Sequence, residues 1–199
     1  MAEDPLKPAG ARVFLAIPLC EIFHEEIGNI LRPLRREIAG VRWVEPRQVH
    51  LTLHFFGVVP LKEIELIHLF SGKVASLFSP FRLSMDRIGG FPSLERPSIV
   101  WLGVEEPAGQ LLSLQKAIQG EVRTQGFEVE ARPFHPHATI GRVKRKSRDL
   151  GLLLAKLPFP GLSPEKIADH FVLYQSHTSP EGARYEILKT YLLSKKASA

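Results

Sequence analysis

Apolar and polar residues alternate in two stretches of the chain that share a four-residue pattern. The first is His50-Leu51-Thr52-Leu53 and the second is His137-Ala138-Thr139-Ile140. Successive side chains of a β-strand point to opposite faces, so each tetrad predicts a half-buried strand. Its histidine and threonine would share one face, about 7 Å apart, with the apolar residues on the other.

The spacing of apolar residues predicts the other elements. Gly57 is expected to end the first tetrad strand, with Phe55 on its apolar face, and Pro33 to kink or split the first helix. Residues 89–93 are expected to form a turn-rich loop. Strands are predicted over 12–18, 81–88, 98–104 and 127–132, helices over 21–38, 60–78, 111–122 and 150–157, and a hairpin pairing 167–176 with 183–193.

The two halves of the chain repeat one order of elements, a strand, a helix and then a tetrad. His50 lies 38 residues after Arg12, and His137 lies 39 residues after Ser98. The chain resembles a diverged duplication. We expect one domain spanning 1–199, α+β in class, in which two pseudo-symmetric lobes contribute the motifs at 50–53 and 137–140.

Composition and charge narrow the possible partners. The 199 residues are 44% hydrophobic, as in globular proteins, and no apolar run approaches the roughly 20 residues that span a bilayer. The single cysteine, Cys20, forms no internal disulfide, and with the polar start of the chain it favours the cytoplasm. A net charge of +5 favours RNA or another phosphate compound as partner, without a membrane.

Two imidazoles that face each other suit one reaction at a phosphate. Histidine titrates near neutrality, so His50 and His137 would serve as general acid and general base. The hydroxyls of Thr52 and Thr139 would hold the non-bridging oxygens. This is a phosphodiesterase arrangement that needs no metal and no cofactor. A single tetrad is commonly an ordinary surface pair, whereas two in matched contexts favour a shared site.

Other residues and readings remain open. Arg142, Phe56 and His54 are possible substrate-binding residues; Arg142 belongs to a basic run with Lys144, Arg145, Lys146 and Arg148. Phe91, Trp101 and Tyr185 are aromatics that would pack in the core or stack a base. Zinc bound by His50 with His54, or by His135 with His137, is disfavoured because acidic or thiolate partners are not nearby in sequence. A nucleotide-binding or RNA-binding module without turnover is the alternative to an enzyme.

Several longer segments resemble the two-histidine (2H) phosphoesterases, and within them the RNA 2′,3′-cyclic phosphodiesterases once called 2′-5′ RNA ligases. The resemblance covers most of 12–193. The segments are R-V-F-L-A-I-P, V-R-W-V-E-P-R-Q-V-H-L-T-L-H-F-F-G, G-G-F-P with R-P-S-I-V-W-L-G-V, G-F-E-V-E-A-R-P-F-H-P-H-A-T-I-G-R and G-A-R-Y-E-I-L.

This resemblance implies a fold, an activity and roles for four residues. The implied fold has antiparallel sheets lining a central cleft and helices outside. The implied activity is hydrolysis of a terminal 2′,3′-cyclic phosphate on RNA to a 2′-phosphate, with reversible 2′-5′ ligation by the same site. His50 would be the proton donor and His137 the proton acceptor, while Thr52 and Thr139 bind the phosphate. We expect a monomer that acts on such RNA ends or on small cyclic nucleotides.

Overall fold

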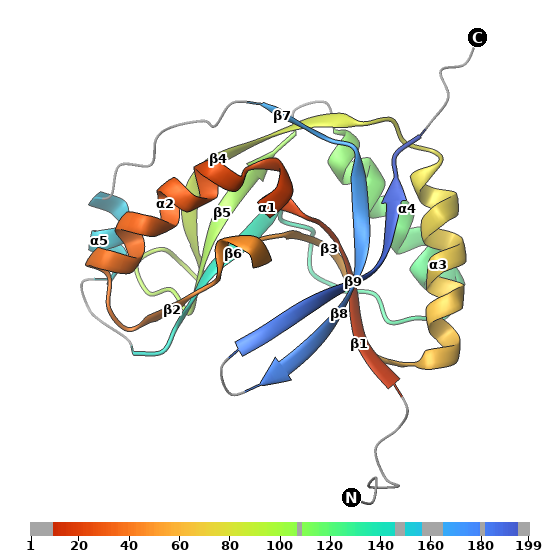
Figure 1. The fold of residues 1–199 in the computed structure, drawn as a ribbon, viewed down its shortest axis with the longest axis horizontal. Coiled ribbons are helices and arrows are strands. Elements are labelled where there is room, and N and C mark those ends of the chain that lie inside the picture. The colour runs from red at the N-terminus through yellow and green to blue at the C-terminus, as the bar shows by residue number, and fades with distance from the viewer. Residues whose placement is uncertain (1–9, 107–108, 146–149, 157–164, 180–181, 195–199) are drawn as a thin grey trace, which may run out of the picture.

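A computed structural model describes residues 10–106, 109–145, 150–156, 165–179 and 182–194 (Figure 1). Its helices are α1 (Leu19–Ile22), α2 (His24–Glu37), α3 (Leu61–Ala75), α4 (Gln110–Thr124) and α5 (Leu150–Lys156), with a 3₁₀ turn, η1 (Pro46–Gln48). Its strands are β1 (Gly10–Ile17), β2 (Val41–Trp43), β3 (Leu51–Pro60), β4 (Phe81–Phe91), β5 (Ile99–Glu105), β6 (His137–Val143), β7 (Lys166–Ala168), β8 (His170–Ser179) and β9 (Gly182–Leu192).

The strands form a curled antiparallel sheet in the order β7-β4-β5-β6-β3-β1-β8-β9, and β2 pairs with β6 (Figure 1). The two strands that carry the tetrads, β3 and β6, are neighbours in the middle of this order. β1 lies next to β3 and β5 lies next to β6, and these are the strands that the sequence predicts at the start of the two halves. The α+β class and the antiparallel architecture expected from the sequence are confirmed.

The helices cover one face of the sheet and enclose the main core. Apolar side chains of α2, α3 and α4 pack there against Leu51 and Ala138, both fully buried. A smaller cluster lies apart from this core and contains only strand residues, among them Phe14 of β1 and Tyr174 of β8. Among the residues described, no helix combines the length and apolar character needed to cross a membrane.

The structure differs from the predicted elements at the first helix, at Gly57 and at 127–132. The first helix divides at Phe23, between α1 and α2, and Pro33 lies inside α2. β3 continues past Gly57 to Pro60. Residues 127–132 form no strand; the prediction of one is wrong. Part of the predicted basic run, Lys146 and Arg148, lies outside the described residues.

The expected loop at 89–93 begins instead as the end of β4, because glycine allows a close approach of the neighbouring strand. Gly89 pairs with Trp101 of β5, and a Cβ on Gly89 would lie only 2.1 Å from the indole ring. The absent side chain therefore leaves room for Trp101 to lie flat across β4. In this position glycine accommodates sheet packing where the sequence suggested a turn.

Candidate active site

The two tetrads meet where β3 and β6 pair. Leu51 is the antiparallel partner of Ala138, and both point into the core. Continuing this register places His50 opposite Thr139 and Thr52 opposite His137, with all four side chains on the face that the core does not occupy. Side chains opposed in this way have Cβ atoms about 5 Å apart. One face of two adjacent strands therefore carries both imidazoles and both hydroxyls.

The two imidazoles are held by the same kind of contact. Nδ1 of His50 lies 2.7 Å from the backbone oxygen of Gln48, and Nδ1 of His137 lies 2.7 Å from that of His135. A carbonyl oxygen only accepts, so each Nδ1 carries the hydrogen and donates it. Each neutral ring is left with an unprotonated Nε2 that is able to take up a proton.

Aromatic rings from β1 and β9 pack against His50, and aromatic rings from β4 and β5 pack against His137. The His50 ring lies 4.9 Å from the ring of Phe14 and meets Tyr185 edge-on at 5.0 Å. The His137 ring meets Phe91 edge-on at 5.0 Å and lies 6.2 Å from Trp101. Three of the aromatics considered as base-stacking residues, Phe91, Trp101 and Tyr185, thus support the two histidines.

Burial and positive charge favour the neutral form of both histidines. Burial lowers the pKa of His50 to about 4, and the nearby charges of His137 and Arg142 act in the same direction. Burial also lowers the pKa of His137, with a further contribution from His135. Arg142 is exposed on β6, and its positive charge acts on both His50 and Tyr185.

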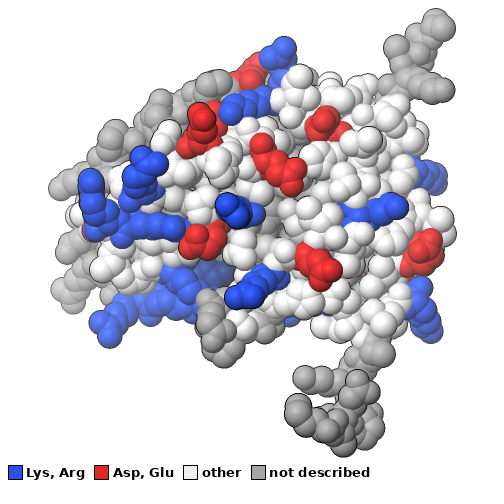
Figure 2. All heavy atoms as spheres, viewed as in Figure 1, with Lys and Arg blue, Asp and Glu red and all other residues white. Residues whose placement is uncertain are grey.

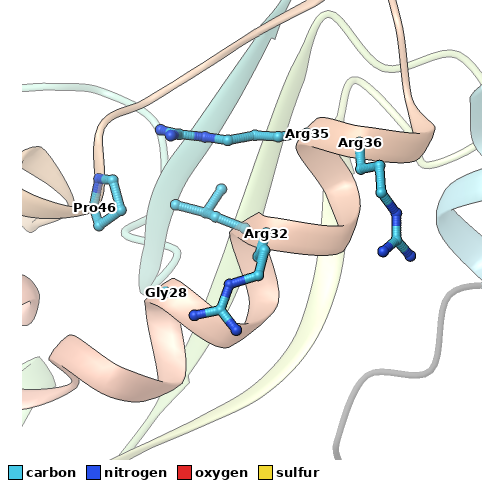
Figure 3. A pocket seen from close by; sticks show the side chains of 6 residues that line it. Gly28, Arg32, Arg35, Arg36 and Pro46 are labelled. Atoms are coloured by element: carbon cyan, nitrogen blue, oxygen red, sulfur yellow. The ribbon is translucent and has the colours of Figure 1, made fainter.

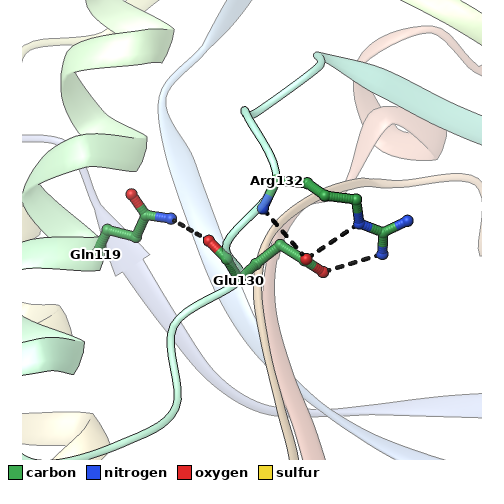
Figure 4. Close-up of polar contacts among 3 residues, drawn as sticks. All are labelled: Gln119, Glu130 and Arg132. Atoms are coloured by element: carbon green, nitrogen blue, oxygen red, sulfur yellow. Dashed lines mark hydrogen bonds and ion pairs between the residues drawn. The ribbon is translucent and has the colours of Figure 1, made fainter.

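The segment that leads into His137 is tied down by polar contacts (Figure 4). Gln119 of α4 donates to the backbone oxygen of Glu130 at 3.4 Å. The guanidinium of Arg132 donates two hydrogen bonds to the Glu130 carboxylate, of 3.1 and 3.2 Å. The Arg132 contacts lower the pKa of Glu130. The Gln119 contact joins α4 to the loop whose end supplies the His135 carbonyl to His137, and the Arg132 contacts lie within that loop.

A known protein family matches most of this chain. The model of the 2′-5′ RNA ligase superfamily matches residues 23–163, more than half of the chain. The chain belongs to this superfamily. It is 32% identical to an Archaeoglobus fulgidus protein named RNA 2′,3′-cyclic phosphodiesterase, over 90% of this chain and 99% of that protein. A Thermotoga maritima protein of the same name is also 32% identical, over 89% and 92%.

Solved structures agree with this membership. TT0787 of Thermus thermophilus superposes with a TM-score of 0.78 at 25% identity, covering 94% of this chain and all of that one. Escherichia coli LigT, crystallised with 3′-AMP, gives a TM-score of 0.74 at 25% identity, over 94% and 99%. The expected relationship to the 2H phosphoesterases is confirmed.

Two residues that the sequence suggested as substrate-binding, His54 and Phe56, do not lie on the face that carries His50 and His137. His54 is only 4% exposed and Phe56 packs against the main core, where their rings are 4.6 Å apart. The cause is a β-bulge: Ala16 pairs with Thr52, but Leu15 pairs with His54, so Leu53 is an extra residue in β3. The bulge turns His54 inward. The structure thus places His54 and Phe56, both expected to bind substrate, on the core side of the sheet.

The same irregularity exposes an aromatic residue that the sequence assigned to the apolar face. A second bulge, at Phe56, leaves Phe55 paired with Phe14, and its ring lies 6.4 Å from that of Phe14 on the histidine face. Phe55 is 47% exposed, and Arg12 stacks over it at 4.8 Å. Gly57, which has a positive φ of 76°, is the one sequence signal of an irregular strand here.

The structure separates one of the two histidine pairs considered for zinc, His50 with His54. The bulge puts His54 on the opposite face of the sheet from His50. Within the described part of the chain, no group of three or more His, Cys, Asp and Glu side chains is arranged to hold a metal ion. His135 and His137 remain close to each other, with ring centroids 6.2 Å apart, and His50 shares the tetrad face with His137.

Buried His54 is expected to make the protein sensitive to acid. Its imidazole donates to the Glu128 carbonyl, its Nε2 has no partner among the described residues, and burial lowers its pKa from 6.5 to about 4. The unfolded chain then binds a proton more readily, so stability present above pH 6.5 is lost as the pH falls toward 4. The loss attributable to His54 is about 3 kcal/mol.

Urea unfolding of the wild type and of His54→Leu at pH 7 and pH 4.5 measures this contribution. The variant is expected to lose less stability between the two pH values than the wild type, because the other buried histidines titrate in both proteins. Equal losses would show that His54 is not the acid-sensitive group.

Proposed function

We propose that this chain hydrolyses the terminal 2′,3′-cyclic phosphate of RNA to a 2′-phosphate without a metal ion. The Leu51 and Ala138 pairing carries the proposal, because it brings two identically anchored imidazoles and two hydroxyls to one face. The relatives named RNA 2′,3′-cyclic phosphodiesterase, at 32% identity over nearly the whole chain, support this substrate. The two repeated halves then act as one catalytic domain.

The proposed reaction is an in-line displacement at phosphorus. His137 Nε2 takes a proton from water as the water oxygen bonds to phosphorus. The bond from phosphorus to O3′ breaks, and His50 gives its proton to O3′, while the bond to O2′ remains. Thr52 and Thr139 donate to the non-bridging oxygens, where negative charge increases in the transition state. Arg142 adds a positive charge that attracts the phosphate.

An RNA oligonucleotide ending in a 2′,3′-cyclic phosphate, incubated with the protein and EDTA, tests this function. The expected product carries a 2′-phosphate, distinguishable from a 3′-phosphate by a phosphatase specific for the 3′ position. A 3′-phosphate product would contradict the assignment of O3′ as leaving group. Complete loss of turnover with EDTA would contradict the metal-free mechanism.

The pH dependence of kcat/KM tests the acid-base pair, since this ratio reports groups of the free enzyme. One imidazole must be charged and the other neutral, yet burial lowers the pKa of both, that of His50 to about 4. We therefore expect kcat/KM to rise as the pH falls from 8 toward 5, by up to about tenfold per pH unit. The profile is the same whichever histidine donates. A ratio that rises toward pH 8 would rule out this pair.

In ligation an RNA 5′-hydroxyl takes the place of water: His137 Nε2 accepts its proton as its oxygen bonds to phosphorus, and His50 gives a proton to O3′ as the bond from phosphorus to O3′ breaks. We propose that the site joins such ends through a 2′-5′ bond when their concentration is high. The anchored Nδ1 atoms favour catalysis over simple binding, because binding a phosphate does not require two free Nε2 atoms directed to one site.

A further inference from the structure

A second region able to receive an anion lies on α2, outside the histidine site. It is an open pocket of about 540 Å³, and the three arginine side chains that line it project from α2 in different directions (Figure 3). Its lining residues are Gly28, Leu31, Arg32, Arg35, Arg36 and Pro46. Uncharged residues beside guanidinium groups suit a nucleotide, because its base and sugar are uncharged and its phosphate is anionic.

The arginines of this pocket differ in what holds them. Arg35 reaches toward Pro46 and donates to the Val44 carbonyl and the Glu45 carboxylate, both at 3.0 Å (Figure 3). Arg36 is paired with Glu37. Arg32 is exposed and has no hydrogen-bond or ion-pair partner within the described ranges. Arg32 is thus the guanidinium free to take up an anion.

The pocket is connected to the histidine site through η1. Pro46 lines the pocket and begins η1, and Gln48 at its end accepts the hydrogen bond from His50. Pro46 and His50 are four residues apart, so their Cα atoms lie within about 15 Å. Lys and Arg side chains gather over α2 and near β2 (Figure 2). Exposed basic residues here and near the histidines are Arg32, Arg35, Arg36, Arg42, Arg47, Arg142, Lys144 and Arg145.

We propose that the α2 pocket binds a backbone phosphate of the RNA strand a few nucleotides before its cyclic end. This inference rests on the proposed function and names its substrate class: single-stranded RNA longer than the reacting nucleotide. Arg32 forms a charge-assisted contact with the phosphate, and Pro46, which is partly exposed, contacts the adjoining sugar or base. A mononucleoside cyclic phosphate fills only the histidine site.

Two variants weaken this contact in different ways. Arg32→Gln removes the charge, and Gly28→Leu fills the pocket, since a Cβ on Gly28 meets no atom within 4 Å. Each has a matched control on α4. Arg123→Gln removes another exposed helical arginine, and Gly120→Leu alters another half-exposed helical glycine whose Cβ would meet open space.

The experiment compares KM for a ten-nucleotide RNA with a 2′,3′-cyclic end and for a mononucleoside 2′,3′-cyclic phosphate. Fluorescence anisotropy gives the Kd of the same labelled RNA. Arg32→Gln and Gly28→Leu are expected to raise KM and Kd for the oligonucleotide about five- to tenfold and to leave KM for the mononucleotide unchanged. Arg32→Gln should also reduce the slope of log Kd against log salt by about 0.7. Both controls should match the wild type.

Oligonucleotide Kd values unchanged in both pocket variants, or raised equally in the controls, would overturn the inference. Equal increases in KM for both substrates would do the same, because they would place Arg32 at the reacting phosphate. Failure of the proposed function is a separate result: the wild type would hydrolyse neither substrate, while the anisotropy measurement would still decide whether the pocket binds RNA.

Discussion

Replacing either His50 or His137 with alanine is expected to lower kcat for a 2′,3′-cyclic phosphate by a factor of about 10² to 10⁴. Each substitution removes the only Nε2 that the corresponding tetrad directs toward the shared face. Steady-state rates on a mononucleoside cyclic phosphate measure the loss without contributions from a longer RNA. KM is expected to change little, since neutral imidazoles contribute less to binding than to proton transfer.

The double variant distinguishes a cooperating pair from two independent contributions. Groups that act in one step are strongly non-additive, so His50→Ala with His137→Ala together should cost about as much as the more damaging single change. His24→Ala, at an exposed histidine at the start of α2, is the control and should retain the wild-type rate. Multiplicative losses in the double variant would contradict a concerted acid and base.

Thr52→Val and Thr139→Val are expected to lower kcat by about 10- to 10³-fold. Valine keeps the branched shape that fits a strand and removes only the hydroxyl. A donor aimed at an oxygen that gains charge in the transition state typically contributes a factor of 10² to 10³. The loss should appear in kcat, because the hydroxyl is needed most when the charge develops.

Serine variants at the same positions provide the matched control. Thr52→Ser and Thr139→Ser keep the hydroxyl and should recover most of the rate, whereas the valine variants should not. Thermal unfolding checks that all four proteins fold alike. An increase in KM with unchanged kcat in the valine variants would show that the threonines bind substrate and transition state equally.

Alternation predicted the polar face of each tetrad correctly because a side-chain period of two is local. The anchored orientation of His50 and His137 depends on the carbonyls of Gln48 and His135, each two residues earlier in the chain, and residue identity does not specify the direction of a backbone carbonyl. The prediction of a strand at 127–132 is wrong because contacts outside the sheet are not visible in the sequence pattern. Backbone and side-chain bonds among Gln119, Glu130 and Arg132 satisfy that segment outside the sheet.

The sequence by itself determined two half-buried strands, the four polar residues that they present and the family that contains them, since these follow from periodicity and from residue identity. The tertiary structure decided that Leu51 faces Ala138, which brings the tetrads together. It also decided that His54 turns inward and Phe55 outward. A bulge exists only relative to the strand that pairs with it. The partner of β3 here is β1, which is distant from β3 in sequence, so the sequence of β3 alone does not show the bulge.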